Sequence, residues 1–311
     1  MSVRRWFVVI LVGITLLPGC SLRSMAVNAV LPTLVNPDVY LSDEDPELVR
    51  DALPFLLETI ESILEADPTR QDTLLFANTG FLLYANAFLQ TDAVIAEWDD
   101  YDRAAELNER ARRMYLRARD YGLRNVEIDY PGIGDRLRTD PESAVVVFEP
   151  DDVEALYYLG GAWVLAISVG LEQPGLVADI PAARALLDRA LELDEAYERG
   201  TLHSVFITLE SVDGSYATAR EHFNRAVELS EGQDAAPYVS FATGVAVAKE
   251  NREEFRELLE TALAIDPDDQ PSNRLLNLVA QRRARSFLDH IDDLFFEPLE
   301  DDELTDDRES R

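Results

Sequence analysis

The chain has 311 residues, of which 60 are acidic and 28 are basic, so its formal net charge is −32. This acidic balance argues against nucleic acid as a partner, because basic patches supply most of the affinity in such complexes. Hydrophobic residues make up 47% of the chain, which excludes disorder throughout and allows an ample core. Cys20 is the single cysteine, so no disulfide forms within the chain.

The N-terminus has the pattern of a bacterial lipoprotein signal. A pair of arginines precedes an apolar run over residues 6–17, which is shorter than the roughly 20 residues of a membrane-spanning helix. Leu-Pro-Gly-Cys at residues 17–20 then resembles the lipobox, although Pro18 departs from the favoured alanine or serine. The resemblance implies a signal peptide over residues 1–19 and lipidation of Cys20. An ordinary signal peptide with a chance cysteine is the alternative.

A lipid on Cys20 would hold the mature chain on a membrane surface without spanning it. The next residue is Ser21 rather than aspartate, which by analogy with sorting in Gram-negative bacteria favours the outer membrane over the inner membrane. We therefore expect a periplasmic, lipid-anchored protein. Residues 20–45 are expected to form a lipidated N-terminal tether.

Beyond the tether, apolar residues recur at helical spacing, and turn residues separate the apolar runs. Pro54 is expected to bend the first helix, and Gly122 is expected to end the third. Residues 123–149 are the least regular stretch and predict a loop inserted between repeats. The predicted helices cover about residues 46–66, 72–89, 100–121, 151–169, 181–193, 201–210, 215–229, 235–248, 252–265 and 271–296.

The helix endings repeat with a fixed period, since Ala190, Ala226 and Ala262 are 36 residues apart. A period in the thirties is typical of stacked helical hairpins, and the tetratricopeptide (TPR) repeat, at about 34 residues, is the nearest type. We predict an all-α fold over residues 46–296, a solenoid-like stack of TPR-like hairpins with a C-terminal capping helix. Residues 297–311 are expected to be an acidic disordered tail.

The sequence shows no catalytic constellation. The three histidines, His203, His222 and His290, lack the spacing of metal ligands, and acidic pairs are too common in this chain to be informative. We expect no enzymatic activity, no metal and no cofactor. The arginines at 282, 283 and 285 are able to bind an anion, but we expect them to face solvent and to pair with carboxylates.

The inner face of the array is the candidate binding surface. In TPR-like hairpins, one set of positions on each first helix lines the concave groove. An exposed groove with mostly apolar or small residues would mark a site for a partner or a hydrophobic small ligand. Alternatively, the groove closes on a neighbouring helix and the same residues are core. The predicted groove residues are Leu75, Thr79, Leu83, Tyr157, Gly161, Val164, His203, Ile207, Val239 and Thr243.

Several segments together resemble the TatT family, the T component of TPR-protein-associated TRAP transporters. They lie at residues 53–61, 110–123, 159–163, 255–267, 281–285 and 292–295, within a region of similarity over residues 22–296. The resemblance implies an all-helical periplasmic lipoprotein that associates with the solute-binding P component of an ATP-independent uptake system. It also implies handling of a hydrophobic or organic-acid ligand, and the ability to form homo-oligomers.

Two other functions remain open from the sequence. One is a TPR lipoprotein of outer-membrane assembly or envelope maintenance, which the same signal and repeats would suit. The other is an enzyme on a helical scaffold, which ranks last because it requires clustered His, Asp and Arg side chains in one pocket.

Overall fold

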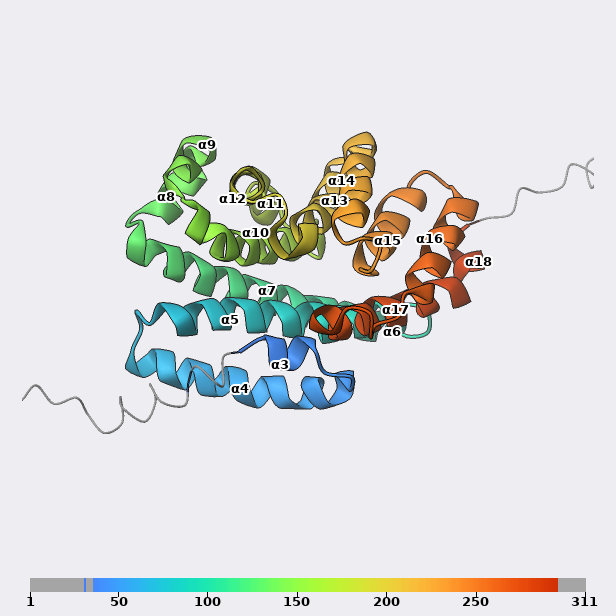
Figure 1. Cartoon of the computed structure of the whole chain (residues 1–311), viewed down its shortest axis with the longest axis horizontal. Coiled ribbons are helices and arrows are strands. Elements are labelled where there is room, and N and C mark those ends of the chain that lie inside the picture. Colours follow the sequence, from blue (N-terminus) through green and yellow to red (C-terminus); the bar gives the residue numbers. More distant parts are fainter. Residues whose placement is uncertain (1–30, 32–35, 296–311) are drawn as a thin grey trace, which may run out of the picture. The chain divides into compact units, whose positions relative to one another are not determined.

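The computed structural model describes Leu31 and residues 36–295. The predicted signal peptide, Cys20 and the acidic tail lie outside the described residues. Contacts divide the chain after Asn36, and residues 37–295 fall in the second unit. In that range every regular element is a helix and no strand occurs, which confirms the all-α prediction (Figure 1). Across the described part of the chain, no helix combines the length and apolar character needed to cross a bilayer.

The first three predicted helices begin within one residue of their predicted positions, and α4 matches its prediction at both ends. The carboxylate of Asp45 accepts hydrogen bonds from the backbone N–H groups of Glu47 and Leu48, at 3.1 and 3.2 Å, and Pro46 occupies the first turn. Local capping chemistry thus fixes this start. The elements are α3 (Asp38–Leu41), α4 (Pro46–Ala66), α5 (Gln71–Tyr84), the π-helix η1 (Ala85–Gln90), α6 (Thr91–Ala96) and α7 (Tyr101–Asp129).

The prediction of an irregular loop at residues 123–149 is wrong. Helix α7 continues to Asp129, and α8 (Ile133–Thr139), α9 (Pro141–Ala144) and the 3-10 turn η2 (Val145–Val147) follow. Gly122 does not end α7 but lies inside it, where an added Cβ would be 2.8 Å from Oδ1 of Asn78. The glycine therefore permits close helix packing, whereas the left-handed turn lies at Gly132, with φ of 80°.

The predicted later hairpins are confirmed within a few residues. Ala190, Ala226 and Ala262, the residues that repeat with a fixed period, are at most 1% exposed and pack between helices. The elements are η3 (Pro150–Asp152), α10 (Val153–Ser168), α11 (Pro174–Val177), α12 (Ile180–Leu193), η4 (Tyr197–Gly200), α13 (Thr201–Asp213), α14 (Tyr216–Leu229), α15 (Ala236–Phe241), the π-helix η5 (Ala242–Ala246) and α16 (Arg252–Ala264).

The C-terminal segment is broken rather than one long helix. It consists of η6 (Pro271–Asn273), α17 (Arg274–Asp289) and α18 (Ile291–Leu294), interrupted at His290. Helix α17 packs against α15 and α16, as a capping helix would, and also against α3, α4, α6 and η1 (Figure 1). The Trp98 Nε1 donates to Oγ of Ser286 at 3.0 Å, and its ring stacks on His290 at 4.6 Å. Helix α17 therefore joins the two ends of the array.

Candidate functional site

An apolar cavity of about 230 Å³ lies between the inner helices. Its wall is formed mainly by α5, α10, α13 and α15, the first helices of their hairpins, and by α17. Helix α17 thus covers the face that the stacked hairpins leave free. Leucine and valine side chains form much of the wall: Leu82, Leu83, Leu165, Val205, Leu276 and Val279.

The predicted groove residues are divided between this cavity and the helix packing. Thr79, Leu83, Tyr157 and Val239 line the cavity. The others do not: Gly161, Val164, His203 and Ile207 are buried, and Leu75 and Thr243 are partly exposed. That the cavity binds a ligand stays a prediction.

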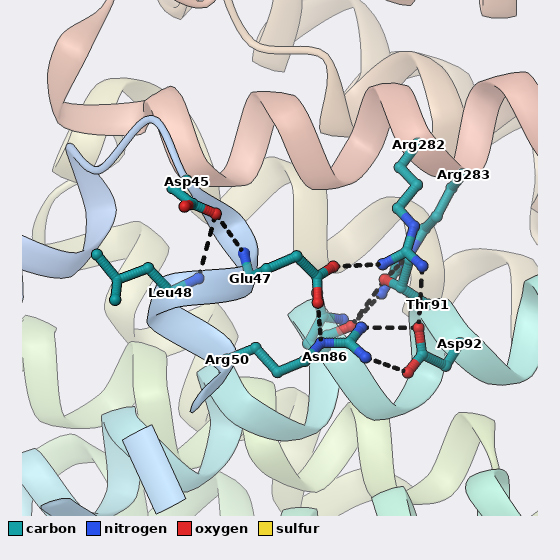
Figure 2. Close-up of polar contacts among 9 residues, drawn as sticks. All are labelled: Asp45, Glu47, Leu48, Arg50, Asn86, Thr91, Asp92, Arg282 and Arg283. Atoms are coloured by element: carbon teal, nitrogen blue, oxygen red, sulfur yellow. Dashed lines mark hydrogen bonds and ion pairs between the residues drawn. The ribbon is translucent and has the colours of Figure 1, made fainter. Parts of the chain in front are cut away.

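One polar end of the cavity is formed by Arg283 of α17. Its Nε donates to Oγ1 of Thr91 at 2.7 Å, and Nη2 donates to the backbone oxygen of Asn86 (Figure 2). Asn86 lies in the π-helix η1, and its carbonyl also accepts from the Thr91 hydroxyl at 3.2 Å. A π-turn of this kind places a backbone acceptor outside the regular helical ladder. Burial lowers the pKa of Arg283.

Arg283 and its neighbour Arg282 have different partners. Arg282 lies 3.6 Å from Oε1 of Glu47 and 3.4 Å from Oδ1 of Asp92, as expected from the sequence for a solvent-facing arginine (Figure 2). Within the described residues, no carboxylate forms an ion pair with Arg283. The expectation of carboxylate pairing is therefore wrong for Arg283, because α17 turns this side chain toward η1 and the cavity.

Asp234 and Asn273 also line the cavity. Oδ1 of Asp234 accepts a hydrogen bond from Nδ2 of Asn273 at 2.8 Å, which favours the charged carboxylate. Burial is the larger effect, and it raises the pKa of Asp234. Asp234 lies in the segment that precedes α15, and Asn273 is the last residue of η6, just before α17.

A strained turn leads into the cavity wall. Oη of Tyr157 and Oγ1 of Thr201 are 3.0 Å apart, and both residues line the cavity. Residues 198–200, just before Thr201, have φ values of 43°, 60° and 84°. The first two are not glycine, and such conformations persist only when the surroundings enforce them. Arg199 supplies part of that support, because it donates to Oε1 of Gln233 at 2.9 Å.

His203, one of the predicted groove residues, forms a pair with His222 instead of lining the cavity. Their Nδ1 atoms are 2.8 Å apart, and the His222 ring stacks on Phe206 with centroids at 4.6 Å. Burial lowers the pKa of both imidazoles, that of His222 to about 4. Both rings are therefore neutral at neutral pH, and one Nδ1–H donates to the other Nδ1.

Sequence reasoning missed Arg283, Asp234, Asn273 and Asn86. In the sequence Arg283 is only one member of a basic cluster, and no local pattern predicts that α17 packs back on η1. Within residues 36–295, no three His, Cys, Asp or Glu side chains are grouped to hold a metal. The cavity offers an apolar volume, hydroxyls and two charged side chains, which is an arrangement suited to binding a small molecule.

Two comparisons extend over most of the chain. The model of the family described as "TRAP transporter T-component" matches residues 42–295, which include the helices from α4 to α18. A protein of Treponema pallidum (strain Nichols), described as "Uncharacterized protein", is 30% identical over 305 residues. That alignment covers 90% of this chain and 94% of the relative.

Proposed function

Given that the chain belongs to the TRAP transporter T-component family, we propose that it is a lipid-anchored periplasmic scaffold that binds the solute-binding P component of a TRAP-type uptake system. A TRAP-associated role follows from the family itself. The family match over residues 42–295 carries the proposal, because it includes the hairpins and the helix that joins their ends. The family is a transport component, and we propose no enzymatic activity for this chain.

The cavity supports a second part of the proposal, in which the protein helps to transfer an apolar or organic-acid ligand. A scaffold that only docks a partner does not need an internal apolar cavity, because an unfilled cavity lacks packing contacts and so lowers stability. Here the volume persists between five helices, and polar side chains converge on it. Cavities of this kind are common small-molecule sites.

Co-purification tests the docking. The tagged full chain is solubilised with detergent from its native membrane, captured, and its bound proteins are identified. We expect a TRAP-type solute-binding protein in stoichiometric amount, with an untagged strain as the control. Recovery of outer-membrane assembly proteins without a binding protein would support the alternative role in envelope maintenance and would refute this one.

The membrane anchor has its own test. The Cys20→Ser variant removes the thiol that the lipobox would lipidate, so we expect this variant in the soluble periplasmic fraction. The wild-type chain should remain with the membranes, and separated membranes should place it in the outer one. Partner capture should survive the substitution, because the docking surface belongs to the helical array. A Cys20→Ser chain that stays membrane-bound would refute lipidation as the anchor.

A further inference from the structure

Arg283 is a cation without a counter-ion among the described residues. Its hydrogen-bond partners are the Thr91 hydroxyl and the Asn86 carbonyl, both neutral. Arginine keeps its proton in proteins, so the guanidinium stays charged even though burial opposes it. The side chain is partly buried, and a charge removed from water in this way is costly unless an anion completes its surroundings. The residue lines the cavity, so an anion in the cavity would be its partner.

The nearest carboxylates are already used by other arginines. Asp92 accepts two hydrogen bonds from Arg50, both at 2.8 Å, and also lies 3.4 Å from Arg282. Glu47 is shared by the same two arginines (Figure 2). Arg282 therefore pairs with two carboxylates. Among the described residues, the neighbouring Arg283 pairs with none.

The two charged ends of the cavity are separated along α17. Asn273, which donates to Asp234, directly precedes α17, and Arg283 lies on its third turn. Nine residues of α-helix span roughly 14 Å. Between these ends, Leu276 and Val279 of α17 line the cavity. The cavity therefore has a cation at one end, a carboxylate at the other and apolar walls between them.

We propose that this cavity binds an alkyl monocarboxylate, whose carboxylate pairs with Arg283 and whose uncharged end lies toward Asp234. The inference deepens the proposed role in ligand transfer and rests on it. A cavity of about 230 Å³ has room for about eight water-sized groups, which suits a chain such as that of octanoate. A dicarboxylate of the same length would place its second carboxylate toward Asp234, and the like charges would repel.

Calorimetric titration of the full chain in lipid nanodiscs tests the proposal, with empty nanodiscs subtracted. The probes are sodium octanoate, 1-octanol and disodium octanedioate, at about pH 8 so that the Asp234 carboxylate is ionised. A charge-assisted pair with Arg283 should make octanoate bind at least about tenfold more tightly than octanol. Octanedioate should also bind at least about tenfold more weakly than octanoate. Equal affinities for octanoate and octanol would overturn the proposal without any variant.

Matched variants locate the two ends of the ligand. Arg283→Met should weaken octanoate binding at least about tenfold and leave octanol binding unchanged, while the adjacent Arg282→Met should bind octanoate as the wild type does. Asp234→Asn should strengthen octanedioate binding about tenfold. Octanoate affinity that is unchanged in a folded Arg283→Met chain would refute the assignment. These titrations use no solute-binding protein, so a negative result would refute carboxylate binding in the cavity without affecting the proposed docking. In the same way, a failed co-purification would refute the docking without affecting the titration result.

Discussion

His222 stacks on Phe206 while its Nδ1 lies 2.8 Å from that of His203, so a titratable pair is enclosed by α13 and α14. Four charged groups surround the pair. Glu195 and Arg225 act on His203, and Glu210 and Arg184 act on His222. Burial remains the largest influence on both pKa values.

We predict that this pair makes the fold acid-sensitive. The pKa of His222 falls from 6.5 in a free side chain to about 4 in the folded state. The folded state thus binds fewer protons than the unfolded state in this range, so stability falls as the pH drops from about 6.5 through about 4. Because His222 is partly exposed, screening should limit its share to about 1–2 kcal/mol. Urea unfolding at a series of pH values measures the loss.

The variant His222→Gln keeps a hydrogen-bonding group but does not titrate, so its stability should depend less on pH than that of the wild type. His290→Gln is the control, because His290 lies outside the pair and stacks on Trp98. Parallel pH profiles for His222→Gln and the wild type would contradict the prediction.

Alanine substitutions at two adjacent glycines of α10 should change the stability of the fold in opposite directions. A Cβ on Gly160 would lie 2.7 Å from Cγ of the buried Leu187, whereas a Cβ on Gly161 would meet no atom within 4 Å. We expect Gly160→Ala to cost about 1–2 kcal/mol through overpacking, and Gly161→Ala to add about 0.5–1 kcal/mol through helix preference. Thermal and urea unfolding of both variants measure the difference. Equal effects would show that Leu187 repacks freely.

The ion pair between Arg184 and Glu210 should be far more costly to break than a surface pair. Nη1 of Arg184 is 2.5 Å from Oε1 of Glu210, which is 4% exposed. Arg184→Met leaves a buried carboxylate without this partner and should lose about 3 kcal/mol of unfolding free energy. Arg103→Met, which breaks the exposed pair with Glu106, should change it by less than about 0.5 kcal/mol.

A double variant separates attraction from desolvation. Arg184→Met combined with Glu210→Met removes both charges, so it should recover a large part of the stability that Arg184→Met loses. If adding Glu210→Met to Arg184→Met lowers the stability further, the unpaired Glu210 carboxylate is not the source of the loss.

Asn277 should hold the segment that carries Asp234. The side chain is fully buried, its Oδ1 accepts from the backbone N–H of Ala235 at 2.9 Å, and its Nδ2 donates to the carbonyl of Gln233 at 2.9 Å. Asn277→Ala leaves both backbone groups unpaired and should cost about 2–3 kcal/mol. Hydrogen exchange should rise at the Ala235 amide. Asn251→Ala, which removes an exposed helix cap, should cost only about 1 kcal/mol and leave that amide protected.

Local chemistry accounts for what the sequence predicted well. The cap at Asp45 and the Asp-Pro pair after Ala66 specify α4, and the alanine period specifies the later hairpins. The prediction failed at Gly122, where a glycine suited to a helix end instead lets α7 approach α5 and α10. Helix α6 was also missed, because its six residues are too few for a periodic signal.

The residues that line the cavity could be predicted from the sequence only in part. Thr79, Leu83, Tyr157 and Val239 could be placed on an inner face from helical spacing alone. Arg283 could not, because its position depends on contacts with residues 192 and 197 positions earlier. No periodicity within α17 distinguishes Arg283 from Arg282, and only the packing against η1 determines which of them faces the cavity.

The packing of α17 on both ends of the array also affects how the protein is made. In an open solenoid each repeat contacts only its neighbours, so folding can spread from any point and terminal repeats can fray. Here α17, the last long helix, packs against α3, α4 and α6 near the start of the chain. These contacts join residues far apart in the sequence, which raises the contact order of the fold and should slow folding. During synthesis, the apolar cavity acquires its final wall only after α17 has left the ribosome. A chain truncated before α17 should therefore expose apolar residues that α17 normally covers, and it should aggregate more readily.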